Sequence, residues 1–292
     1  MDQPSSGKRF RELPQTHQDQ YRRVMNELMT FAQGHAIPIG FAPPLITVAV
    51  PWAKGASITL PMTLGDIAAA SGCILQLQSG FFLVTAEHVL ACYEKRTNDG
   101  ERLNWQIGKL PPVDPLSRIA WRDKADDRSL MPYRPTDIVF LRLSEQEARD
   151  ACGEARILST PIAPLALSVG QLVVLVGYPN QLKTIDLKGT MNREACGLVF
   201  QVTTIGDGYC KCQFAYEDVL DFSGGLQPLD LSTVNLGGMS GCPAFVLASS
   251  SQCPELYPRL AGVFTSRWGA DPTIEIIEIA TFEKVQESEL RG

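Results

Sequence analysis

The first apolar pattern along the chain has helical spacing. From Gln18 to Gln33 an apolar residue occurs at every third or fourth position, with charged and polar residues between. Gly34 follows and favours the end of a helix. We therefore expect a helix over Gln18–Gln33, packed on the surface of a larger core or, alternatively, serving as an arm that binds a regulatory protein partner. Its apolar stripe consists of Tyr21, Val24, Met25, Leu28, Met29 and Ala32.

The pattern changes after this helix to short apolar runs bounded by turn residues. Pro38–Pro51 contains four prolines, which favours an extended linker or edge segment over a central strand, with a short strand at Ile46–Val50. The spacing of the later runs is typical of an all-β fold. We expect strands at residues 57–60, 73–78, 81–85, 105–110, 138–143, 172–176, 198–204, 209–215, 244–247, 260–266 and 274–279, and a short helix at 145–152.

Composition narrows the classes of function. A chain of 292 residues could form one large all-β domain or two small ones, and its hydrophobic content of 45% is ample for a core. The net charge is −6 and no basic block occurs, which disfavours nucleic acid as a partner. No apolar run reaches the roughly 20 residues that a membrane span needs.

The cysteines and the N-terminus indicate the compartment. The eight cysteines form no Cys-x-x-Cys pair and there are three histidines, so we expect no metal site. The polar start, Met1–Gly7, opens no signal peptide. We therefore expect mostly reduced, buried thiols and a cytoplasmic protein.

Three segments combine reactive side chains with strand-like flanks. Ser240 lies in the glycine-rich stretch Gly237–Pro243, where small residues let the backbone bend and a substrate carbonyl approach. An apolar run, Phe81–Ala86, leads to His88, and Asp137 opens another. Because a serine hydroxyl needs an adjacent base to act as a nucleophile, these three residues are candidates for one hydrolytic site.

The flanks of these residues resemble motifs of the trypsin/chymotrypsin-like serine peptidases. Residues 85–88 (Thr-Ala-Glu-His) are similar to the family's Thr-Ala-Ala-His, and residues 137–141 (Asp-Ile-Val-Phe-Leu) to its aspartate-led strand. Residues 238–243 (Gly-Met-Ser-Gly-Cys-Pro) are similar to its Gly-x-Ser-Gly-Gly-Pro. The resemblance spans Leu60 to Glu283 and is nearest in style to bacterial and viral members that lack disulfides.

The resemblance implies an all-β fold of two six-stranded antiparallel barrels, preceded by the N-terminal helical arm. The arm would comprise residues 1–52 and the peptidase domain residues 53–292. The barrels would occupy residues 57–144 and 160–283. The implied activity is that of a serine endopeptidase, which cleaves protein or peptide substrates through an acyl-enzyme intermediate and needs no cofactor.

The resemblance also assigns roles. Ser240 is the implied nucleophile, His88 the general base and Asp137 the residue that orients the histidine. The backbone N–H groups of Gly238 and Ser240 form the implied oxyanion hole. The rival aspartates lie in a charged loop with no strand after them: Asp123, Asp126 and Asp127.

Two residues depart from the family's pattern. Met239 stands where the animal enzymes have an aspartate that pairs with a newly cut N-terminus, so that activation mechanism is not expected and the oxyanion hole must be held in another way. Cys242 stands where the family usually has glycine, and we interpret it as structural.

The resemblance marks the primary substrate pocket only weakly. Val234 falls at the pocket base, where trypsin has a carboxylate, so a small or apolar substrate side chain is favoured over Arg or Lys. The implied wall consists of Val234, Asn235, Thr265, Ser266 and Arg267.

Two other functions stay open. The first is a latent or inactive protease-fold module that serves as a binding scaffold and is activated by a partner or recruits one. The N-terminal helix and the departures at Met239 and Cys242 keep this function open. The second is an unrelated esterase, but those enzymes carry their catalytic residues in the order Ser, Asp, His, whereas this chain has the order His, Asp, Ser.

Overall fold

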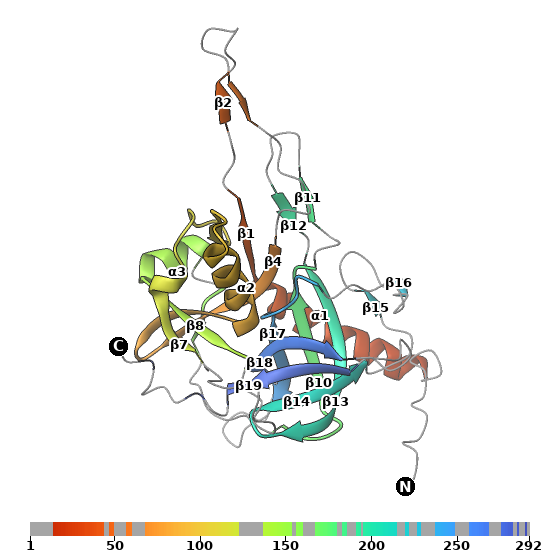
Figure 1. Cartoon of the computed structure of the whole chain (residues 1–292). Coiled ribbons are helices and arrows are strands. Elements are labelled where there is room, and N and C mark those ends of the chain that lie inside the picture. Colours follow the sequence, from red (N-terminus) through yellow and green to blue (C-terminus); the bar gives the residue numbers. More distant parts are fainter. Residues whose placement is uncertain are drawn as a thin grey trace.

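The chain folds mainly into antiparallel strands, with three α-helices in its described part (Figure 1). The structure is a computed structural model. It describes residues 14–43, 47–49, 57–59, 68–122, 137–153, 156–159, 167–179, 183–185, 191–193, 195–214, 220–221, 227–228, 237–248, 257–268, 276–282, 285 and 290. No helix within these ranges is both long and apolar enough to cross a membrane.

The first sheet is built from the N-terminal half of the chain. Its main path runs in the order β6-β1-β4-β5-β8-β7, and the short β9 (Leu158–Ser159) pairs in parallel with β4. The other pairings are antiparallel. The six strands of the path are β1 (Ile37–Ala42), β4 (Ala68–Leu77), β5 (Gly80–Thr85), β6 (Asn104–Ile107), β7 (Ile119–Arg122) and β8 (Val139–Leu143).

The C-terminal half forms a closed six-stranded barrel in the order β10-β13-β14-β19-β18-β17. All six pairings are antiparallel. The strands are β10 (Leu172–Gly177), β13 (Cys196–Gly206), β14 (Tyr209–Phe214), β17 (Pro243–Ala248), β18 (Tyr257–Trp268) and β19 (Ile276–Thr281).

The two units share one strand order. In each, the first three strands are neighbours, the sixth follows the third, and the fifth follows the sixth. The fourth strand lies beside the first in both units: β6 beside β1 and β17 beside β10. This repeated order is the trypsin-like two-barrel arrangement, so the expected fold class is confirmed. The first unit differs in two respects: its ring is open between β6 and β7 within the described residues, and the short β9 pairs in parallel with β4.

The structure corrects the prediction for the proline-rich segment. Pro38 lies in β1, which is an interior strand between β6 and β4, not a linker or edge. The ladder between β1 and β6 begins at Ile39 opposite Ile107, so Pro38 lies beyond its end and needs no N–H there. Its carbonyl still accepts a hydrogen bond from Gly108 N at 2.8 Å. The first sheet thus includes part of the expected arm, and the division of the chain at residue 52 stays a prediction.

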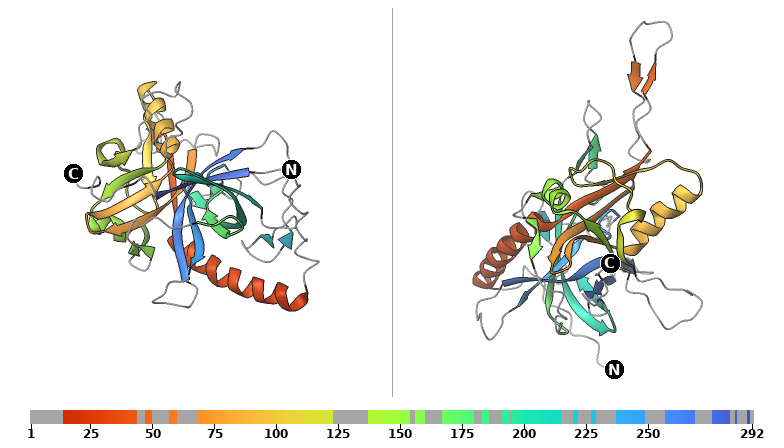
Figure 2. Two further views of the ribbon diagram at one scale, coloured as in Figure 1. Left: turned by 90° about the horizontal axis from the view of Figure 1, so that it is seen from below. Right: turned by 90° about the vertical axis from the view of Figure 1, so that its left-hand side faces the viewer.

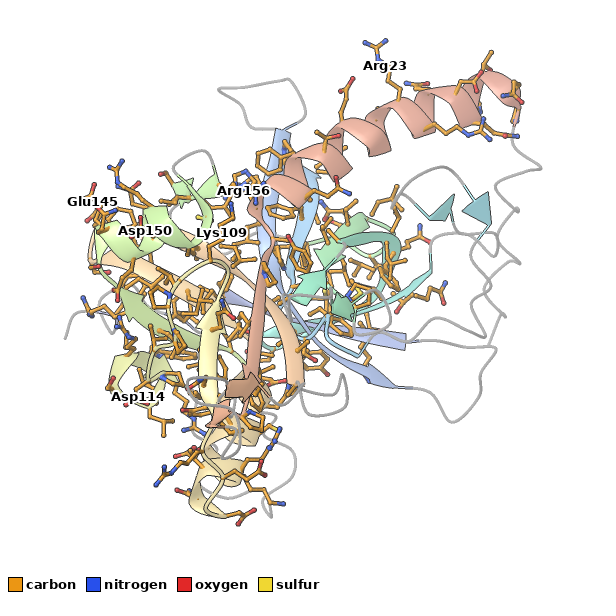
Figure 3. All side chains as sticks on the ribbon, turned by 90° about the horizontal axis from the view of Figure 1, so that it is seen from above. Arg23, Lys109, Asp114, Glu145, Asp150 and Arg156 are labelled. Carbon is orange, nitrogen blue, oxygen red and sulfur yellow. The ribbon has the colours of Figure 1, made fainter. Side chains whose placement is uncertain are left out.

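Helix α1 (Gln15–His35) is slightly longer than expected and packs on the second barrel. Leu28 and Ala32 are buried in a core shared with strands β10 and β17. Figure 2 shows α1 and α2 on opposite sides of the molecule. The exposed side chain of Arg23 points away from the sheets (Figure 3). A partner-binding role for this helix stays a prediction.

The other two helices lie beside the first sheet. Helix α2 (Glu87–Asn98) was not anticipated, and it begins one residue before His88. Helix α3 (Glu145–Cys152) was predicted with the same bounds. Ser144 and Glu147 form a reciprocal capping box at its start, which satisfies two otherwise unpaired backbone N–H groups.

Short hairpins and a short turn of helix complete the described elements. They are β2 (Thr47–Ala49) with β3 (Ser57–Thr59), β11 (Lys183–Ile185) with β12 (Met191–Arg193), β15 (Leu220–Asp221) with β16 (Gln227–Pro228), and the 3-10 helix η3 (Leu116–Arg118). The β2–β3 hairpin projects from the body of the molecule (Figure 1).

Several strands are buried on both faces because the two units pack against each other. In β10, Val173 and Leu175 lie inside the second barrel, whereas Val174 and Val176 lie in the core between the units. Strands β4, β5, β8 and β17 alternate in the same way between an interior core and this shared core. Because both faces of these strands are buried, their sequences are nearly continuous apolar runs.

We expect Leu28→Ala to lower the free energy of unfolding by about 2–5 kcal/mol, because the change leaves a cavity in the shared core. Urea denaturation would measure this loss. The neighbouring exposed substitution Glu27→Ala is the control, with an expected change within about 0.5 kcal/mol. Equal, small effects of the two substitutions would mean that α1 does not contribute to the core.

Candidate active site

Strand pairing brings His88 and Asp137 together. The ladder of β5 and β8 places Thr85 opposite Val139, so the residues after β5 lie beside the residues before β8. His88 Nδ1 lies 2.7 Å from Asp137 Oδ2, and the His88 backbone N–H donates to Asp137 Oδ1 at 2.8 Å. The Glu87 N–H donates to the Asp137 backbone carbonyl at 3.2 Å. The start of α2 is therefore held to the start of β8 by three hydrogen bonds.

The surroundings of His88 favour its protonated form. Burial by itself lowers the pKa of the imidazole, but the hydrogen bond and charge of Asp137, with a smaller contribution from Glu87, outweigh that effect. The pKa of His88 is therefore raised above its ordinary value. A raised pKa makes the imidazole a stronger base, as a group that accepts a proton during catalysis needs.

An ion pair lies next to the histidine. Arg122 Nη2 lies 2.6 Å from Glu87 Oε1, with exposed side-chain fractions of only 12% and 14%. The same guanidinium contacts Glu94 Oε2 at 2.8 Å through Nη1. Burial tends to lower the pKa of Arg122, but its two carboxylate partners raise it. Sequence reasoning missed this network, although the acidic residue directly before His88 departs from the family's alanine.

Ser240 lies in a tight turn that requires glycines. The Cys242 N–H donates to the Met239 carbonyl at 2.8 Å, and Gly241 has a φ of 82°. A positive φ at this third position of a turn is typical of type II turns and favours glycine. Gly238 also has a positive φ, of 91°. Met239 is almost fully buried in the core of the second barrel, so an apolar anchor occupies the position where the animal enzymes have an aspartate.

The serine turn packs directly against the first sheet. A Cβ atom at Gly241 would overlap Thr85 Oγ1 and the Ser71 carbonyl and would lie 2.7 Å from Ala86 N. The Ser71 N–H donates to the Ser240 carbonyl at 2.9 Å. On the other side, the Gly241 N–H donates to the carbonyl of Phe264 in β18 at 2.7 Å. The turn is thus held between the barrel that carries it and the strand that leads to His88.

Ser71 is a site residue that sequence reasoning missed. It is completely buried in β4, and its hydroxyl accepts from Tyr178 N and donates to the Gly238 carbonyl, each at 2.9 Å. The Thr85 hydroxyl donates to the Ser71 carbonyl at 2.8 Å. The available signal was a serine within the small-residue run Ala68–Gly72 of a strand, where a buried hydroxyl must find partners.

The structure describes part of the expected pocket wall. Thr265 is buried in β18, at an irregularity in its pairing with β19. Ser266 and Arg267 continue that strand opposite Glu278 and Ile277. Val234 and Asn235, like the rival aspartates Asp123, Asp126 and Asp127, lie outside the described residues.

Cys242 is buried against Gly177, where a Cβ atom would lie 2.7 Å from the Cys242 Cβ. This packing agrees with its interpretation as a structural residue. No group of three His, Cys, Asp or Glu side chains within the described ranges is arranged to hold a metal ion.

No protein-family model and no curated protein matches this chain. Among solved structures, the thermostable serine protease AL20 from an extremophilic microorganism is 12% identical, with 89% of this chain and 97% of that chain covered and a TM-score of 0.45. Neuropsin, a serine protease expressed in the limbic system of mouse brain, is 11% identical, with coverages of 87% and 92% and a TM-score of 0.42. At these identities and TM-scores the two structures show nothing about the activity of this chain.

The histidine titrations test the arrangement. We expect the His88 ring to titrate above its ordinary pKa and His35 below it, because burial dominates at His35. Asp137→Asn removes the nearby negative charge and should lower the pKa of His88. Proton NMR of the histidine rings would measure both values, with His17, His35 and His88 assigned by substitution.

His35 is the internal control in this experiment. Its Nδ1 lies 3.0 Å from the Arg156 carbonyl, beside the end of α1 (Figure 3), so its titration should not respond to Asp137→Asn. An unchanged His88 pKa in Asp137→Asn would contradict the arrangement.

Because folding raises the pKa of His88, the contribution of this residue to stability is full below about pH 6.5 and is lost as the pH rises through the pKa of His88 in the folded protein.

Proposed function

We propose that this protein is a serine endopeptidase in which Ser240 is the nucleophile, His88 the general base and Asp137 the residue that orients the base. The observation that carries the proposal is the His88 Nδ1–Asp137 Oδ2 contact of 2.7 Å, next to a serine turn packed against Thr85 and Ala86. The strand order supports it further, because each unit contributes one side of the site.

The contact with Asp137 selects the reactive form of the histidine. An ionised carboxylate can only accept hydrogen bonds, so Nδ1 of the neutral imidazole carries the proton. Nε2 then has its lone pair available for the proton of the Ser240 hydroxyl. When Nε2 takes that proton, Asp137 stabilises the positive charge that forms, in keeping with the raised pKa of His88.

The reaction then proceeds by acyl transfer. Ser240 Oγ bonds to the carbonyl carbon of the substrate while its proton passes to His88 Nε2. The carbonyl oxygen becomes an oxyanion, which the N–H groups of Gly238 and Ser240 stabilise. The C–N bond breaks as His88 returns the proton to the leaving amine. Water, deprotonated by His88, hydrolyses the acyl-enzyme and restores the serine.

The substrate side chain would enter a pocket walled by Val234, Asn235, Thr265, Ser266 and Arg267. No carboxylate stands at position 234, so a small or apolar residue before the cleaved bond is favoured over Arg or Lys. The proposed substrates are proteins or peptides.

Labelling by a fluorophosphonate probe tests the proposal. We expect the native chain to be labelled, Ser240→Ala not at all, and His88→Ala at a rate lower by roughly 10³-fold or more, since the serine then lacks its base. Ser79→Ala is the matched serine control, because the Ser79 hydroxyl, in the β4–β5 turn of the first sheet, is buried and has no hydrogen-bond partner among the described residues. Its labelling should equal that of the native chain.

The alternative function predicts a different result. A latent or inactive binding module would fold, as circular dichroism would show, but the native chain would not be labelled. Labelling that persists in Ser240→Ala would contradict the proposed nucleophile instead.

A further inference from the structure

Ser71 bonds to the two residues that provide the proposed oxyanion hole. Its hydroxyl donates to the carbonyl of Gly238, and its backbone N–H donates to the carbonyl of Ser240. The N–H groups of these same residues are the proposed oxyanion donors. Because a peptide unit is planar, the bond to the Gly238 carbonyl fixes the unit between Gly238 and Met239, and the bond to the Ser240 carbonyl fixes the unit between Ser240 and Gly241. The unit that carries the Ser240 N–H lies between these two fixed units, and the unit that carries the Gly238 N–H directly precedes the first. The two bonds therefore restrict both N–H groups through the backbone dihedral angles of Gly238, Met239 and Ser240.

The direction of each hydrogen bond at Ser71 is determined by its partners. Tyr178 N can only donate, so the Ser71 oxygen accepts there at 2.9 Å. The Gly238 carbonyl can only accept, so it receives the single hydroxyl proton of Ser71. Both partners are themselves anchored, because the Tyr178 hydroxyl donates to the Ala36 carbonyl at 3.3 Å and Gly238 is buried.

The serine turn needs such a support. Met239 has no charge with which to fix the loop, and its apolar side chain anchors the turn in the second barrel without specifying the peptide orientations on either side. The two Ser71 bonds lie one residue before and one residue after Met239. They also cross from the first sheet to the turn, which belongs to the other unit.

We propose that Ser71 is a positioning residue that orients the oxyanion-binding N–H groups of Gly238 and Ser240 through its hydrogen bonds to their carbonyls. The inference rests on the proposed function and adds to it a residue outside the catalytic set. Ser71 does not contact the reacting atoms. Its role is to keep the two N–H groups directed at the position where the oxyanion forms. Donors that are already oriented toward this position lower the activation free energy of acyl transfer.

The test compares Ser71→Ala with the control Ser79→Ala. Burst-phase acylation by p-nitrophenyl acetate gives the rate constant of acylation and the half-saturating ester concentration. We expect Ser71→Ala to lower the rate constant about 10- to 100-fold while the half-saturating concentration changes less than about 3-fold, since oriented donors act mainly on the transition state. Ser79→Ala should stay within about 2-fold of the native chain.

Histidine NMR separates positioning from general damage. The pKa of His88 depends on its burial and on Asp137 and Glu87, so it should be unchanged in Ser71→Ala. A rate constant within about 2-fold of native overturns the inference, as does a loss accompanied by a shifted His88 titration. A native chain that is not acylated contradicts the proposed function and this inference with it.

A second variant covers the case in which Ser71→Ala does not fold. Ser71→Cys places a sulfur atom where the serine oxygen was, but a thiol is a weak hydrogen-bond donor. A lower rate constant with an unchanged His88 titration supports the inference, and a native rate constant overturns it.

Discussion

The candidate site depends on how closely the two sheets can approach at Gly241. A side chain there would collide with Ser71, Thr85 and Ala86, so the serine turn can reach the first sheet only because glycine has no Cβ. The apolar core between the units, which includes Val84 and Phe245, holds the sheets at this distance. The packing that stabilises the fold therefore also brings the parts of the site together.

Each unit supplies a different part of the candidate site. The first sheet supplies His88 and Asp137, because β5 ends where β8 begins. The second barrel supplies the serine turn, which enters β17. Neither unit holds the complete proposed set, so relative movement of the two sheets would disturb the geometry more than any change within one. Ser71 is placed to resist such movement, because it lies in one unit and bonds to the other.

Charge is concentrated on the histidine side. Arg122 pairs with both Glu87 and Glu94, which balances the negative charge that would otherwise gather near His88 and Asp137. The serine turn is held by different forces, namely the buried Met239 and backbone hydrogen bonds. The candidate site thus combines a charged half around His88 with a neutral half that holds the backbone of the serine turn.

Local pattern was enough to find the doubly buried strands, such as Leu172–Gly177, because their apolar runs are continuous. It failed at β1 because a proline by itself favours an edge strand. Pro38 is tolerated in an interior strand because the ladder between β1 and β6 ends at Ile39, so no N–H is needed at position 38. It also failed at α2, which begins directly after an apolar strand and has Ala86, which cannot cap it with its side chain, at the N-cap position. Tertiary pairing, with Glu87 and His88 bonded to Asp137, holds that helix start.

The sequence by itself determined which side chains are the candidates for the site, because His88, Asp137 and Ser240 each stand in a recognisable local context. It also determined where most strands of the second barrel lie, because their apolar runs are visible in the sequence. Only the tertiary structure decided the partners of Ser71, the contact of Gly241 and the ion pair of Arg122. Each of these joins residues far apart in the chain, and no local pattern shows which distant residue a side chain or backbone group will contact in the folded protein.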